Sequence, residues 1–87
     1  MEEVKSKVSG SYDKARILLA EALEVDPESL NGNSGVESLE AWDSLGHLRI
    51  VTEIESQTGA ELSPEQVLAL STLDDIANLL DQLSGAG

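Results

Sequence analysis

Ser44, which follows Asp43, is the residue of this chain best suited to carry a covalent modification. Asp43 suits the N-cap of a helix, so Ser44 would occupy the first helical turn, where backbone N–H groups lack partners within the helix. A phosphate attached to Ser44 would therefore lie at the positive end of the helix dipole. Spacing alone also allows the alternative that Asp43 and Ser44 are only competing caps.

Hydrolysis is a second chemistry that the same serine suggests. His47 lies three residues after Ser44, and a serine beside a histidine can act as a nucleophile with its base. A helical wheel instead places His47 near the middle of the buried arc, which favours a packed or hydrogen-bonded structural histidine. The stretch 42–46 also lacks the first glycine of the G-x-S-x-G elbow, so we do not expect an enzyme.

The helix that opens at Ser44 should run to Thr58, because Gly59 is well placed as its left-handed C-terminal stop. One arc of its surface, about 160° wide, should face the core. This arc contains His47, Leu48, Ile50, Val51, Ile54 and Thr58. Leu45 lies outside the arc, close to Arg49, and an exposed leucine beside an exposed serine suggests a functional surface.

A long amphipathic helix should precede this site. Apolar residues recur with helical spacing over residues 12–23, and Val4 and Val8 continue the stripe toward a start near Glu3. Pro27 disfavours helical geometry at the residue before it and so marks the end of the helix.

Two shorter helical segments should follow the site. Ser63, Pro64 and Gln66 form a capping box with a proline at the first helical position, which predicts a short helix through Leu70. Thr72 then caps a last helix, whose first turn carries two aspartates that suit the helix dipole. The apolar stripe of this helix consists of Leu73, Ile76, Ala77, Leu80 and Leu83.

A long loop over residues 25–43 should connect the first two principal helices, because it is rich in glycine, asparagine and serine and has no helical periodicity. Four apolar residues are expected to attach it to the core, namely Val25, Leu30, Val36 and Leu39. Trp42 is the only tryptophan, and we expect it to anchor the loop at the helix entry. Contact with an attached group or with a partner is the alternative role for Trp42.

These elements predict an all-α fold, a small bundle of three main helices and one short helix, in a single domain over residues 1–87. Its core should cover about residues 11–83, and residues 84–87 should form a flexible tail because they have nothing to pack. Hydrophobic residues make up 40% of the chain and aromatic residues only 2%, so the core should be aliphatic.

The charge of the chain restricts its partners. Seventeen acidic and five basic residues give a formal net charge of -12, which disfavours nucleic acids and anionic membranes and favours partners with basic surfaces. Solubility alone is the alternative explanation of this charge. Because no apolar stretch resembles a signal peptide or a membrane span, we expect a soluble, cytoplasmic protein. We also expect it to be a monomer.

A metal site is not expected. Cysteine is absent, so a thiolate zinc site is excluded. Asp26, Glu28 and Glu37 match three positions of a calcium-binding EF-hand loop, but Leu30 and Asn31 stand where an oxygen ligand and the turn glycine are needed.

The triplet Asp43-Ser44-Leu45 resembles the Asp-Ser-Leu motif of the acyl carrier protein family, and the likeness extends from about Ser11 to Leu83. The resemblance implies that a phosphopantetheinyl transferase moves 4′-phosphopantetheine from coenzyme A to Ser44. Acyl intermediates would then be held as thioesters on this arm and delivered to acyl-activating or acyl-transferring enzymes.

Two departures from the family pattern concern the pathway. Fatty-acid carriers usually have a small residue before the motif and acidic residues on the exposed face of the second helix, whereas this chain has Trp42 and Arg49. The chain therefore looks more like free-standing carriers of specialised pathways, such as those for secondary metabolites, polyketide-like products, modified lipids or surface polysaccharides. The expected partner-recognition residues are Asp43, Leu45, Arg49, Thr52 and Glu53. The alternative function is an unmodified acidic helical adaptor that binds a basic protein surface.

Overall fold

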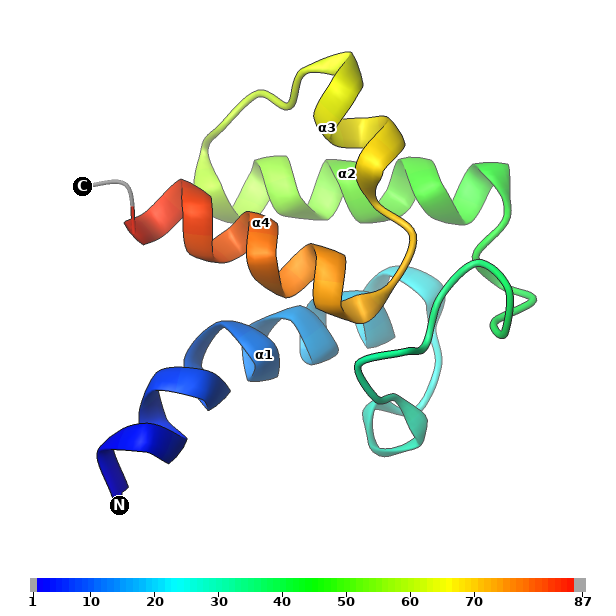
Figure 1. Cartoon of the computed structure of the whole chain (residues 1–87). Helices are drawn as coiled ribbons and strands as arrows, with labels where there is room; N and C mark the ends of the chain where they lie inside the picture. Colours follow the sequence, from blue (N-terminus) through cyan, green and yellow to red (C-terminus); the bar gives the residue numbers. More distant parts are fainter. Residues whose placement is uncertain (1, 86–87) are drawn as a thin grey trace.

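The computed structural model describes the backbone of residues 2–85 and the side chains of residues 11–83. It is a helical bundle, shown in Figure 1, and this confirms the predicted fold class. The elements are α1 (Glu2–Leu23), the 3-10 turn η1 (Pro27–Ser29), α2 (Ser44–Thr58), α3 (Pro64–Ala69) and α4 (Leu73–Gly85). Helix α1 packs against α2 and α4, and α2 also contacts α4.

The core is mainly aliphatic, as the composition predicts, although it includes Trp42, and most of it is formed by the three long helices. Its largest fully buried side chains are Leu18, Leu19, Ile50, Ile54, Leu73 and Ile76. Burying each of these side chains stabilises the fold by roughly 1.5–3 kcal/mol. The core therefore holds α1, α2 and α4 together as one unit.

The first helix ends earlier than Pro27 requires. Its helical residues stop at Leu23, and Glu24 adopts the left-handed conformation with a φ of 60°. The Val25 N–H then donates to the Ala20 carbonyl oxygen at 3.0 Å, which closes the end of the helix. The helix begins at Glu2, close to the expected start, and the predicted apolar side chains of Val4 and Val8 lie outside the described side chains.

The buried face of α2 differs from the predicted arc. Ile50 and Ile54 are fully buried, but Leu48 is 62% exposed and Thr58 is also exposed, so their assignment to the core was wrong. The physical reason lies at Gly46, which is buried. The Ala41 carbonyl and a Leu23 methyl group lie so close to it that a Cβ atom would not fit. This close approach turns α2 so that the row of residues 46, 50 and 54 faces the core.

The long loop is attached to the connection between α3 and α4. Val36 N–H donates to the Ser71 carbonyl oxygen at 3.0 Å, and Leu73 N–H donates to the Ser34 carbonyl oxygen at 2.8 Å. Of the four apolar residues expected to pin the loop, Leu30 is buried and Val25 and Leu39 pack against the core. The fourth expectation was wrong, because Val36 is 46% exposed.

Helices α3 and α4 have the predicted caps. In α3, Ser63 and Gln66 form the capping box with hydrogen bonds of 3.1 and 2.8 Å. At the start of α4, the Thr72 hydroxyl accepts from the Asp75 N–H at 3.2 Å. Helix α4 continues through Gly85, past the predicted start of the tail at residue 84, and Ala86 and Gly87 lie outside the described residues.

The Asp75 carboxylate stabilises this second cap. It accepts hydrogen bonds from the Ser71 N–H, the Ser71 hydroxyl and the Thr72 N–H at 2.9–3.0 Å. Partial burial favours the protonated acid, but the bonds from Ser71 and Thr72 outweigh this effect and lower the pKa of Asp75. The carboxylate therefore ties the connection that carries the loop to the first turn of α4.

The attachment of the loop predicts a strong effect of substitution at Gly35. A Cβ atom at this position would overlap the Ser71 carbonyl oxygen, which accepts the hydrogen bond from Val36. We expect Gly35→Ala to lower the free energy of unfolding in urea by about 2 kcal/mol. Gly32→Ala is the matched control, since its Cβ would meet only the flexible Asp74 carboxylate. Equal losses for both variants would contradict the proposed attachment.

Candidate functional site

The start of α2 places Ser44 at the surface. The Asp43 carboxylate accepts a hydrogen bond from the Gly46 N–H at 2.9 Å, so Asp43 is the N-cap and Ser44 is the first residue of the helix. Ser44 is exposed, and its hydroxyl makes no hydrogen bond with the described residues. The serine therefore does not compete with Asp43 as a cap, and its oxygen is available at the positive end of the helix.

An open groove of about 530 Å³ lies beside Ser44, between α2 and α3. Its apolar lining includes two strongly exposed leucines, Leu48 (62%) and Leu68 (83%), together with Val36 from the loop. Exposed apolar side chains in one place mark a surface that contacts a ligand or a partner. Sequence analysis did not single out Leu68, because a six-residue helix is too short to show a periodic pattern.

Trp42 and His47 form a hydrogen-bonded chain under this groove. Trp42 Nε1 lies 2.8 Å from His47 Nδ1, and His47 Nε2 lies 2.8 Å from the Val67 carbonyl oxygen. An indole N–H only donates and a carbonyl only accepts, so Nδ1 is unprotonated and Nε2 carries the proton. The chain connects the loop, α2 and α3.

These hydrogen bonds test the roles predicted for Trp42 and His47. Trp42 is 4% exposed, so it anchors the loop at the start of α2 as predicted, although it also lines the groove beside Ser44. The structural role predicted for His47 is confirmed, because both of its ring nitrogens are engaged. Neither nitrogen is therefore placed to take a proton from Ser44 in this arrangement.

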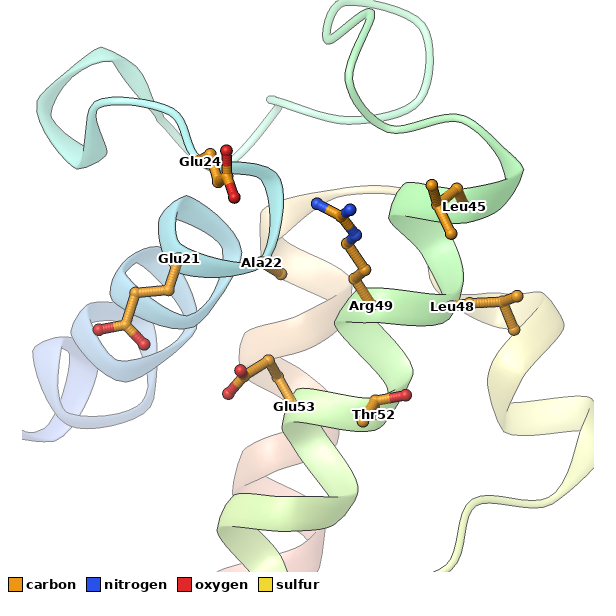
Figure 2. Close-up of a pocket in the computed structure, with 8 residues that line it drawn as sticks. All are labelled: Glu21, Ala22, Glu24, Leu45, Leu48, Arg49, Thr52 and Glu53. Carbon is orange, nitrogen blue, oxygen red and sulfur yellow. The ribbon is translucent and has the colours of Figure 1, made fainter.

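The other side of α2 carries the remaining predicted recognition residues. A groove of about 390 Å³ between α1 and α2 brings together Leu45, Arg49, Thr52 and Glu53, as Figure 2 shows. Leu45 is 59% exposed, Arg49 and Thr52 are exposed, and Glu53 is half-buried. Two further residues that the sequence analysis missed line the same groove, Glu21 from the last turn of α1 and Glu24 directly after this helix.

A smaller groove of about 160 Å³ joins this surface to the start of α2. It shares Ala22, Leu45 and Arg49 with the larger groove and reaches Asp43. Ser44 itself lines only the groove on the α3 side. The structure therefore brings four predicted recognition residues to one side of α2 and opens Ser44 toward the other side, while Asp43 borders grooves on both sides.

The described part of the chain contains neither a membrane-spanning helix nor a cluster of metal ligands. None of its helices is long and apolar enough to cross a membrane. Its side chains also include no group of three or more histidines or carboxylates that could hold a metal ion.

The chain matches a known protein family. A family model described as a phosphopantetheine attachment site matches residues 13–80, which is most of the chain. The chain belongs to this family of acyl carrier proteins. Domains of the family attach a 4′-phosphopantetheine group, which supplies the terminal thiol that holds acyl groups as thioesters. Membership also implies interaction with a modifying transferase and with enzymes that handle acyl groups.

The start of α2 in this carrier fits the phosphopantetheine group. An exposed serine oxygen, an adjacent helix N-terminus and an open apolar groove offer an attachment point, a phosphate environment and a surface for an extended arm. Asp43 would hold the helix start in place and Leu48 and Leu68 would contact the arm or its cargo.

The hydrogen-bonded chain of Trp42, His47 and Val67 can be tested directly. Trp42→Phe keeps an aromatic ring but removes the N–H donor, so we expect the free energy of unfolding to fall by about 1–2 kcal/mol. Nitrogen NMR of the unsubstituted carrier should place the imidazole proton on Nε2. A double-mutant cycle with His47→Leu separates the hydrogen bond from lost ring volume. A coupling energy near zero, or a proton on Nδ1, would contradict the assignment.

Proposed function

We propose that this carrier bears its 4′-phosphopantetheine arm on Ser44 and delivers acyl groups on that arm to partner enzymes. The observation that carries the proposal is the exposed, unbonded hydroxyl of Ser44 in the first turn of α2. Asp43 already caps the helix, so Ser44 has no structural task that would conflict with modification.

The attachment step follows from the chemistry of coenzyme A. The Ser44 oxygen forms a bond to the phosphorus that carries pantetheine, and the bond from that phosphorus to the nucleotide breaks. The nucleotide leaves as adenosine 3′,5′-bisphosphate, and the serine proton passes to a base on the transferase. The resulting phosphodiester keeps one negative charge, which the unpaired N–H groups of the first turn of α2 stabilise.

The specialised pathway that we propose depends on charge. Arg49 is the only lysine or arginine after residue 16, and it stands on the exposed face of α2 among predicted recognition residues. A cation in this place repels the basic docking surfaces that suit an acidic helix. The carrier is therefore expected to serve dedicated enzymes rather than general fatty-acid enzymes, with Trp42 as a second departure at the motif.

The attachment residue is tested by intact mass after incubation with coenzyme A and a broad-specificity phosphopantetheinyl transferase. We expect a single addition of about 340 Da that Ser44→Ala abolishes. Ser56→Ala, an exposed serine on the same helix, should leave the addition unchanged. No addition with several transferases would favour the unmodified adaptor, whose support is the net charge and the exposed Leu45. Ester hydrolysis that depends on Ser44 and His47 would favour an enzyme instead.

The role of Arg49 in partner choice has its own test. Arg49→Glu should increase acyl loading or turnover by enzymes of fatty-acid synthesis by about fivefold, because it replaces repulsion by attraction. Arg49→Lys keeps the charge and should leave the rate near that of the unsubstituted carrier. Unchanged rates for Arg49→Glu would show that the charge at this position does not determine the choice of partner enzymes.

A further inference from the structure

Glu24 has a backbone conformation that its residue type disfavours. Among the described residues it is the only non-glycine residue with a positive φ, and its value is 60°. Glycine is the usual residue at this position after a helix, because a Cβ atom crowds the backbone in the left-handed region. Folding alone would therefore be served better by glycine, and such a local cost points to a task outside folding.

The side chain of Glu24 lies where that task can be performed. It lines the groove between α1 and α2, and Figure 2 shows its carboxylate pointing toward the guanidinium of Arg49. Arg49 makes no ion pair with any side chain that the structure describes. The two groups therefore point toward one another without forming an ion pair. The Glu24 carboxylate is accessible to a positively charged side chain of a partner.

The charges around this groove are not balanced. Three carboxylates, those of Glu21, Glu24 and Glu53, line the groove together with one cation, Arg49, so the groove keeps an excess of negative charge. Arg49 repels a cation that approaches the middle of the exposed face of α2. The carboxylates at the end of α1 are consequently the place where a positively charged side chain of a partner is attracted most.

The phosphopantetheinyl transferase fits this chemistry. It must bind the diphosphate and the 3′-phosphate of coenzyme A next to Ser44, so it needs lysine or arginine side chains close to the start of α2. The smaller groove that includes Asp43 leads from there to the groove that holds Glu24. A cationic surface at Ser44 can therefore continue across Leu45 to the end of α1.

We infer that the surface that binds the transferase extends from α2 onto α1, and that Glu24 contacts a lysine or arginine of the transferase there. This inference rests on the proposed function, because it requires modification of Ser44. It makes Glu24 a specificity-determining residue that the carrier retains at the expense of local backbone strain.

The experiment compares Glu24→Gly and Glu24→Gln with the unsubstituted carrier. For each protein, kcat/KM for modification of Ser44 by a phosphopantetheinyl transferase is measured at low and high salt, and Tm is measured separately. We expect kcat/KM to fall about fivefold at low salt for both variants and the difference to shrink at high salt. Tm should rise by about 4 °C for Glu24→Gly, which relieves the strain, and should stay nearly unchanged for Glu24→Gln.

The control is Glu61→Gln, which makes the same change of charge on the connection between α2 and α3, outside all of the grooves described. It should leave kcat/KM near the unsubstituted value. A lower kcat/KM together with a higher Tm for Glu24→Gly supports the inference, since a purely structural residue would not produce opposite effects. Unchanged kcat/KM for the Glu24 variants, a lower Tm for Glu24→Gly, or an equal loss for Glu61→Gln would overturn it. Failure of the unsubstituted carrier to be modified would instead overturn the proposed function.

Discussion

The hydrogen bond from the Gly46 N–H to the Asp43 carboxylate is the interaction on which the site depends. It determines where α2 begins, while the absent side chain of Gly46 lets the helix approach the Ala41 carbonyl and a methyl group of Leu23. The loop, α1 and the first turn of α2 therefore meet at one point of the core. Because Gly46 faces inward there, Ser44 and Leu45 before it face solvent.

This orientation places the serine at the boundary of two different surfaces. The groove toward α3 is mainly apolar, and the groove toward α1 carries three carboxylates and a guanidinium. Leu48 lines both grooves, and it is exposed on a helix whose other large aliphatic residues, apart from Leu45, are buried or half-buried. Such a division suits a carrier, because cargo and partner enzyme would approach the same serine from different sides.

Helix α3 forms the wall of the apolar groove with little help from burial. None of its residues is buried, and it is held by hydrogen bonds at its ends and in its middle. Glu55 accepts from the Leu62 N–H at 2.9 Å before the helix, the Val67 carbonyl accepts from His47, and the loop binds the segment after Leu70. Elements held mainly by such hydrogen bonds open at lower free energy than a packed core, so we expect α3 to open more readily than α2.

The sequence by itself determined the local features of this protein. The bounds of α2, the caps at Asp43 and Ser63 and the motif around Ser44 follow from hydrogen bonds and periodicity within a few neighbouring residues. It could not predict the exposure of Leu48, the pairing of the loop with residues 71–74, or the meeting of Glu24 with Arg49. Only the tertiary structure decided these three features, because they depend on how closely α1, α2 and the loop approach one another at Gly46. That distance cannot be predicted from the pattern of neighbouring residues in the sequence.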